Sequence, residues 1–146
     1  MADEPHKLQA QVLTPEGKVY EGEAFQVSTR TVVGEVGVRA RHAPMLARIV
    51  PHELRIYEDE SDFGSSEGAQ RFASAEGWLE VFANKVTVLV GEAHDPSSLD
   101  TAELKSRLED AEQRLGELDE DEDSAQYQTA EQDKLRAEAF LQIAEG

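Results

Sequence analysis

The sequence predicts an α+β protein with an antiparallel β-sandwich or barrel in its first part and two helices in its second. Residues 1–93 contain short runs in which apolar and polar residues alternate, the pattern of strands with one buried face. Glycine and proline interrupt these runs as turn residues do. From about residue 94 the apolar residues recur at intervals of three and four, which is typical of helices. We therefore expect a sandwich domain at 1–93 and a helical domain at 94–146.

The expected strands are short, and no helical pattern separates them, which favours antiparallel pairing. Leu8, Ala10 and Val12 alternate with polar residues, and a turn is expected at 15–18. Further strand candidates lie at 25–29, 54–58, 71–75, 78–82 and 86–90, with turn candidates at 34–37 and 51–53. The polar stretch Asp59–Gln70 is predicted to be a mobile hairpin loop. The aromatic candidates for the core are Phe25, Phe72, Trp78 and Phe82.

The second part is expected to form an antiparallel helical hairpin. Asp100 and Glu103 have the capping-box spacing of a helix start. The apolar stripe of the first helix consists of Leu104, Leu108, Ala111, Leu115 and Leu118. The acidic run 119–123 is expected to connect it to a second helix. The packing face of that helix is expected to contain Tyr127, Ala130, Ala137, Phe140, Leu141 and Ala144.

The charge balance excludes several classes of function. The chain has 31 acidic and 14 basic residues and a formal net charge of −17. Such a surface repels phosphate backbones and anionic headgroups, so we expect no nucleic-acid partner and no direct lipid insertion. The absence of cysteine excludes disulfides, thiolate metal sites and a cysteine nucleophile. A polar start and the lack of a long apolar run predict a soluble cytoplasmic protein.

Motifs for catalysis or metal binding are largely missing from the sequence. Its four histidines, His6, His42, His52 and His94, have no metal-ligand spacing, although two of them could converge in a sandwich. Asp119, Asp121 and Asp123 have the spacing of a calcium loop, but Ser124 stands where glycine is required, so a solvated linker is expected. Two alternatives remain open from the residues: a small metal-dependent sandwich protein, and an adaptor or chaperone that binds clients with its helical hairpin.

Two neighbouring segments carry a family resemblance. Gly34-Glu35-Val36-Gly37-Val38, followed by His42-Ala43-Pro44-Met45-Leu46, closely resembles the "GE(L/I)GI…HAP(L/M)L" signature of the epsilon subunit of F-type ATP synthases. The segments 76–81 and 84–89 are similar to that family's "GGxLEV…(N/D)xVTVLA" strands, and Leu99-Asp100 resembles the start of its C-terminal hairpin. The resemblance extends from about Lys7 to Leu118.

The resemblance implies a sandwich of about ten strands followed by two helices, and a non-catalytic subunit of the rotating central stalk. The sandwich would bind the gamma subunit and the ring of c subunits, and it would transmit ion-driven rotation to the catalytic head. The helices would lie folded or extend along gamma, reach the alpha/beta head and block ATP hydrolysis. The expected location is the cytoplasmic face of the bacterial plasma membrane, as a peripheral part of the complex.

The resemblance also implies which residues contact partners. The expected residues for the c ring and gamma are Gly34, Glu35, Val36, Gly37, His42, Ala43, Pro44 and Met45. Glu35 is expected to face the polar loops of the c ring, and His42 to lie at the same end of the sandwich. Some relatives bind ATP through an LDxxRA signature, but here Glu103 stands where the arginine belongs. We therefore expect no catalytic residue, no metal and no bound cofactor.

Overall fold

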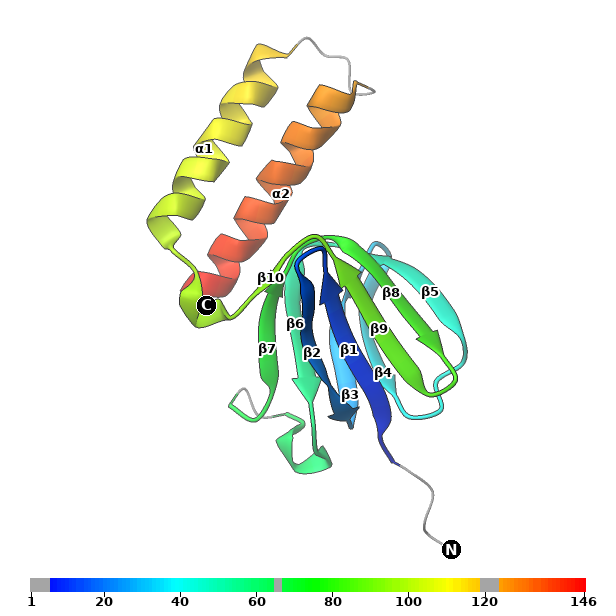
Figure 1. Ribbon diagram of the computed structural model, residues 1–146. Coiled ribbons are helices and arrows are strands. Elements are labelled where there is room, and N and C mark those ends of the chain that lie inside the picture. Colours follow the sequence, from blue (N-terminus) through cyan, green and yellow to red (C-terminus); the bar gives the residue numbers. More distant parts are fainter. Residues whose placement is uncertain (1–5, 65–66, 119–123) are drawn as a thin grey trace, which may run out of the picture. The chain divides into compact units, whose positions relative to one another are not determined.

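The computed structural model describes residues 6–64, 67–118 and 124–146 (Figure 1). The chain divides into two compact units, residues 1–95 and 96–146. The first contains the strands and the second the two α-helices. The acidic connection expected at 119–123, with its calcium-type spacing, lies outside the described residues.

The first unit is built from short strands. These are β1 (Leu8–Thr14), β2 (Gly17–Ala24), β3 (Gln26–Thr31), β4 (Gly34–Arg39), β5 (Met45–Ile49), β6 (His52–Tyr57), β7 (Gln70–Ser74), β8 (Gly77–Phe82), β9 (Lys85–Val90) and β10 (Ala93–His94). A short 3₁₀ turn, η1 (Glu60–Asp62), follows β6. Nine of the strands are joined in the order β10-β7-β6-β3-β5-β8-β9-β1-β2, and β4 pairs with β3.

The strands fold around an aliphatic core, which confirms the predicted sandwich of about ten strands. Neighbouring strands are antiparallel except β1 and β9, which pair in parallel. Leu54, Ile56 and Leu79 are fully buried, and the rest of the core consists of small and medium aliphatic side chains. Because successive side chains of a strand point to opposite faces, this core fixes which residues face outward.

The expectation that Trp78 and Phe82 belong to the core is wrong. Their exposed fractions are 45% and 65%, whereas Leu79 and Val81, which alternate with them in β8, are buried. Both faces of β8 carry apolar residues, so the alternation alone does not say which face turns inward. Packing against the aliphatic residues of the facing strands decides which face of β8 turns inward.

The turn predicted at 34–37 is displaced by a few residues. The stretch 34–37, expected as a turn, begins strand β4, and the turn itself lies at Val32-Val33. The Thr31 hydroxyl stabilises that turn by donating to the carbonyl of Gly34 at 2.8 Å. Gly34 has a φ of +134°, a backbone conformation that favours glycine. Glycine is therefore required here at the exit of the turn.

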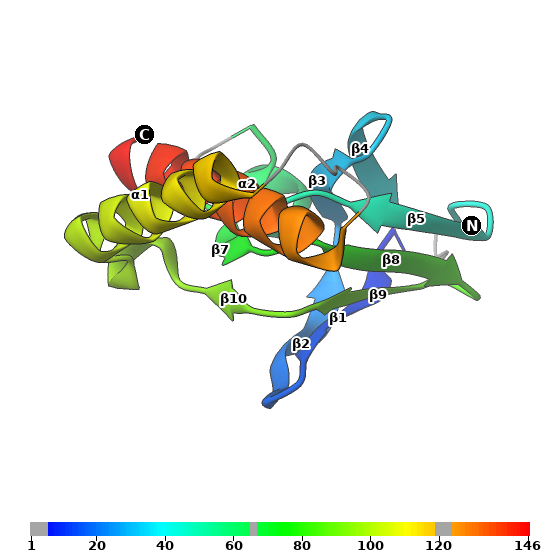
Figure 2. The same ribbon diagram turned by 90° about the horizontal axis from the view of Figure 1, so that it is seen from above.

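The second unit is an antiparallel helical hairpin, as predicted. A 3₁₀ turn, η2 (Pro96–Ser98), precedes α1 (Thr101–Glu117), and α2 (Ala125–Glu145) follows. Figures 1 and 2 show the two helices side by side. The carboxylate of Asp100 caps α1 by accepting from the backbone N–H groups of Ala102 and Glu103, and the Ser124 hydroxyl caps α2. The buried helical residues are Leu104, Ala111, Ala130, Ala137, Phe140 and Leu141. Neither described helix is long and apolar enough to cross a membrane.

Candidate functional site: partner-binding surfaces

The Glu35 carboxylate lies near the start of β4, at the end of the sandwich that carries the β3–β4 turn. Its side chain is 70% exposed, and Nε2 of His52 on β6 lies 3.8 Å from Oε1. Burial and the positive charge of Arg30 lower the pKa of His52 below its ordinary value, although Glu35 opposes this shift. His52 is therefore mainly neutral at pH 7, and the Glu35 charge is left available for a partner.

The segment His42-Ala43-Pro44-Met45 follows β4 and lies at the other end of that strand. Strand β4 separates Glu35 from His42, so the expectation that both belong to one end of the sandwich is wrong. The His42 end is organised by Asn84 in the β8–β9 turn. The Asn84 side chain accepts from the backbone N–H of Arg41 at 2.9 Å and donates to the carbonyl of Lys7 at 3.0 Å. The predicted site residues thus form two separate surfaces.

A third surface, which the local sequence patterns did not predict, is the outer face of β5, β8 and β9. Four large apolar side chains point outward there: Leu46, Trp78, Phe82 and Leu89, with exposed fractions of 66%, 45%, 65% and 45%. Trp78 pairs directly with Leu89 across β8 and β9, and Leu46 pairs with Glu80 across β5 and β8. The four therefore form one patch, called the apolar face below. Exposed apolar patches of this kind mark interaction surfaces.

The charges around the apolar face differ from those of the rest of the chain. The guanidinium of Arg48 lies 5.8 Å from the centre of the Trp78 ring, in the range of cation–π contacts. Lys85 pairs with Phe82 across β8 and β9, and Glu80 supplies one negative charge. The face is therefore apolar with a slightly basic rim, although the whole chain is strongly acidic. The alternation Trp78–Glu80–Phe82 was the sequence signal for it.

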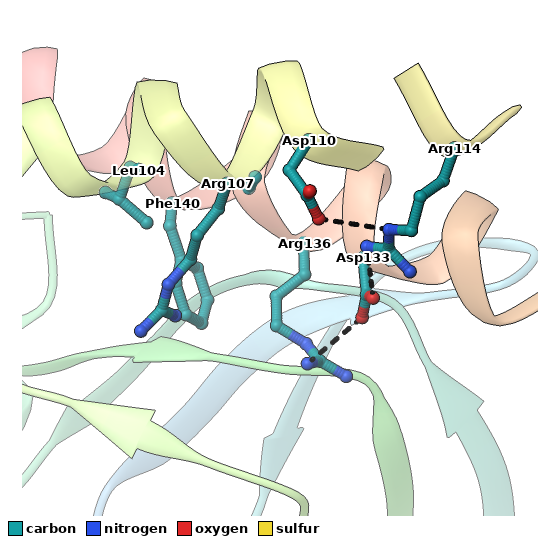
Figure 3. A pocket seen from close by; sticks show the side chains of 8 residues that line it. Leu104, Arg107, Asp110, Arg114, Asp133, Arg136 and Phe140 are labelled. Carbon is teal, nitrogen blue, oxygen red and sulfur yellow. Dashed lines mark hydrogen bonds and ion pairs between the residues drawn. The ribbon is translucent and has the colours of Figure 1, made fainter. Parts of the chain in front are cut away.

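The helical hairpin contains a cavity of about 240 Å³ lined by charged side chains (Figure 3). Three arginines and two aspartates share this lining with apolar residues: Arg107, Arg114, Arg136, Asp110 and Asp133. Nε of Arg114 donates to Asp110 at 3.0 Å, and its Nη2 donates to Asp133 on the other helix at 2.8 Å. Nη1 of Arg136 lies 3.8 Å from Asp133.

The charged side chains that line this cavity do not favour the binding of a nucleoside triphosphate. Glu103, at the arginine position of the LDxxRA pattern, accepts from Nη2 of Arg107 at 2.5 Å. Arg114 and Arg136 are paired with carboxylates of the chain as well. A triphosphate needs an excess of positive charge, and here every arginine of the lining lies beside a carboxylate of the chain, with Asp133 shared between Arg114 and Arg136.

The histidines form no metal centre in the part of the chain that the structure describes. Within residues 6–64, 67–118 and 124–146 no group of three His, Asp or Glu side chains could hold a metal ion. Nδ1 of His42 lies within hydrogen-bond distance of the carbonyl oxygen of Ala43. Nε2 of His94 lies 2.9 Å from a carboxylate oxygen of Glu92.

An exposed apolar face on a β-sandwich that is followed by a helical hairpin is typical of chains that bind other chains. Residues 7–96 match the family model described as "ATP synthase, Delta/Epsilon chain, beta-sandwich domain". The chain is 32% identical to the ATP synthase epsilon chain of Shouchella clausii, over 94% of this chain and 89% of that one. It is 36% identical to the epsilon chain of Persephonella marina, over 92% and 93%. The chain belongs to the family of ATP synthase epsilon chains, as its motifs predicted.

The structure has the same fold as a chain of the Euglena gracilis mitochondrial ATP synthase, in a structure of OSCP, F1 and the c-ring. The TM-score is 0.76 at 21% identity, and the match covers 99% of this chain and 85% of that one. This match shows that the two chains share a fold, and the family membership makes this chain an ATP synthase epsilon chain.

Proposed function

We propose that this chain is a non-catalytic coupling subunit of a bacterial ATP synthase. It binds the gamma subunit and the c ring at the cytoplasmic face of the plasma membrane, and it transmits ion-driven rotation of the ring to the catalytic head. The C-terminal hairpin is the regulatory element, which reaches the alpha/beta head and restrains ATP hydrolysis. Membership of the epsilon family supports this role.

The observation that carries the proposal is the apolar face. Four large apolar side chains exposed on neighbouring strands are unfavourable in water and become stabilising when a partner covers them. We assign this face to the gamma subunit, which must remain attached while the stalk rotates. A large apolar contact suits that requirement, because burying one Leu or Phe side chain contributes about 1.5–3 kcal/mol.

The two other surfaces complete the proposed contacts. Glu35 is exposed, and its neighbour His52 does not neutralise it at pH 7, so it is assigned to the polar loops of the c ring. The segment His42-Ala43-Pro44-Met45 lies at the opposite end of β4 and is assigned to gamma. The resemblance supplied both sets of residues, and their separation by the length of β4 supports assigning them to two different partners.

The test is co-purification of the tagged full-length chain with co-expressed gamma subunit. We expect Leu46→Ser and Phe82→Ser each to lower the affinity for gamma roughly tenfold or more. The matched control is Leu135→Ser, since Leu135 is a similarly exposed side chain (51%) on α2. Circular dichroism checks that each variant is folded. Undiminished gamma binding by folded Leu46→Ser and Phe82→Ser would refute the assignment, and recovery of a mixed set of proteins would support the adaptor alternative.

A further inference from the structure

The two helices of the hairpin are joined by an ion pair inside the cavity described above. Arg114 on α1 is its centre: Nη2 donates to Oδ2 of Asp133 on α2, while Nε donates to Asp110 on its own helix (Figure 3). Arg136 approaches the other carboxylate oxygen of Asp133. The Asp133 carboxylate thus lies between an arginine of each helix.

Several other ion pairs of the hairpin have a different geometry. Arg107–Glu103 and Lys134–Glu138 connect residues four positions apart on one helix. Such pairs support the helix that contains them but do not hold it against its neighbour. The Arg114–Asp133 pair spans nineteen positions of sequence and does connect the neighbouring helices.

The apolar contact between the helices is small. The Arg114–Asp133 ion pair therefore contributes a larger share of the interactions that hold the two helices together. Three of the six buried side chains of the hairpin are alanines, namely Ala111, Ala130 and Ala137. Phe140 is the largest buried side chain, and a cavity of about 240 Å³ remains beside it. Residues 94–146 also carry a net charge of −11, so their acidic side chains repel one another.

We propose that the ion pair between Arg114 and Asp133 holds the two helices of the hairpin together in its closed form. Because the chain's own Asp133 carboxylate binds the arginine of the facing helix, closure requires no bound anion. Asp133 neutralises Arg114 in the closed form, and opening must break this interhelix pair. The two side chains are 39% and 35% exposed, so dissolved ions reach them and screen their attraction. Closure therefore depends on ionic strength rather than on a nucleotide.

This inference goes beyond the proposed coupling role, because it concerns the equilibrium between the closed and the open hairpin in the free chain. It is tested without gamma, the c ring or the catalytic head. A failure here would leave the coupling role intact, and a failure of gamma binding would leave this inference intact.

The experiment is native-state hydrogen exchange on the full-length chain, with the amides of α1 and α2 compared with those of the sandwich. Exchange protection reports how often the hairpin opens. We expect Asp133→Asn at low salt to lower protection in both helices about fivefold, the upper range for a solvent-exposed pair. The matched control is Glu138→Gln, which removes one negative charge from α2 and a pair within one helix. It should change protection less than twofold.

Two further measurements separate the ion pair from a general effect of charge. In a double-mutant cycle, Arg114→Gln combined with Asp133→Asn should open the hairpin little more than either single change. At about 1 M NaCl the screening length falls to about 3 Å, so the difference between wild type and Asp133→Asn should largely disappear. Salt also weakens the general repulsion among the acidic side chains in both proteins. Comparing the difference between the two proteins cancels this shared effect.

Equal protection in wild type and Asp133→Asn would overturn the proposal, and so would an equal loss in Glu138→Gln. Additive effects in the double mutant, or a difference that persists at high salt, would overturn it as well. The wild-type chain and the conservative asparagine variant keep the same packing volume. A fold lost in Asp133→Asn while Glu138→Gln stays folded would itself show that Asp133 holds the hairpin together.

Discussion

Arg71 on β7 donates two parallel hydrogen bonds to the carboxylate of Glu53 on β6. Its Nη2 donates to Oε2 at 2.5 Å and its Nε donates to Oε1 at 3.1 Å. The Nε of Arg55 donates to the same carboxylate. The Glu53 side chain is only 10% exposed, so one nearly buried negative charge is satisfied by two arginines on the outer surface of the sheet. This bidentate geometry ties β6 to β7.

The Glu53 cluster should make stability depend on pH. Burial alone would raise the pKa of Glu53, but the hydrogen bonds from Arg71 and Arg55 outweigh it and hold the pKa below the usual value of 4.5. A carboxylate with a lowered folded-state pKa stabilises the fold above its unfolded pKa. This contribution is lost as the pH falls through the folded-state value.

We therefore expect Glu53→Gln to lower the free energy of unfolding at pH 7 by about 1 kcal/mol, allowing for the solvent contact of the arginines. The difference from wild type should shrink when the pH falls from about 5 towards 3. Urea unfolding at a series of pH values measures it. Glu16→Gln in the β1–β2 turn is the control. A difference that stays constant from pH 7 to pH 3 would contradict the role assigned to the carboxylate.

Gly77, the first residue of β8, should not tolerate a side chain. A Cβ atom at this position would lie 2.0 Å from the carbonyl oxygen of Leu89 and 2.9 Å from Cα of Val90, both backbone atoms of the paired strand β9. Backbone atoms cannot move aside without breaking the β8–β9 pairing. Gly77→Ala should therefore destabilise the sandwich by about 2 kcal/mol or more.

Gly91→Ala is the matched control, because a Cβ atom there meets nothing within 4 Å. It should leave the free energy of unfolding within about 0.5 kcal/mol of wild type. Thermal or urea unfolding of the two variants provides the comparison. Similar stabilities for Gly77→Ala and Gly91→Ala would show that β8 and β9 do not pair as closely as described.

Glu35→Lys should weaken coupling more than it weakens gamma binding. Loss of one exposed charge pair removes about 0.2–1 kcal/mol, and the new lysine adds repulsion towards basic loops of the c ring. Ion-driven ATP synthesis in membrane vesicles should fall, while gamma still co-purifies with the chain. Glu16→Lys reverses an exposed charge elsewhere on the sandwich and should have no effect. Unchanged ATP synthesis with Glu35→Lys would place the c-ring contact elsewhere.

ATP with magnesium should not bind the full-length chain at micromolar concentrations. The arginines that line the hairpin cavity are paired with Glu103, Asp110 and Asp133, and residues 94–146 carry a net charge of −11. A triphosphate would meet like-charge repulsion. Isothermal titration calorimetry should show no saturable heat, and a micromolar site would refute the prediction. Binding gained by Glu103→Arg would identify the Glu103 carboxylate as the excluding group.

A chain that ends at Asp95 should fold as a sandwich and still bind gamma. Strand β10 pairs with β7, and the backbone N–H of Ala75 donates to the carbonyl of Glu92 at 2.9 Å. These bonds remain at Asp95 and are lost in a chain that ends at Gly91, which should be less stable by about 1–2 kcal/mol. Without the hairpin, any restraint on ATP hydrolysis should disappear. Failure of the longer truncation to fold would mean that the helices belong to the core.

Local sequence patterns predict structure correctly where each pattern has one structural solution. The capping pattern at Asp100, the helical stripes and the alternation in β1 predicted elements that the structure contains. The motifs at 34–38 and 42–46 identified the family, which the comparisons confirmed. These signals depend on residues close together in the chain, so no knowledge of long-range packing was needed.

The tertiary structure decided what the local patterns left ambiguous. Trp78 and Phe82 face outward because Leu79 and Val81 fill the core, a choice that depends on the facing strands. Glu35 and His42 are seven residues apart but lie at opposite ends of β4, because an extended strand moves the chain about 3.3 Å per residue.

Composition, periodicity and motifs are properties of the chain alone, and they are sufficient to predict the fold class, the family and the charge of each part. Only the tertiary structure revealed the apolar face and the pairing of Arg114 with Asp133. Both join residues of separate strands or helices, whose distances depend on register and packing. The physical reason is that a side chain's neighbours across a sheet or a hairpin are set by the pairing of elements, which no single segment encodes.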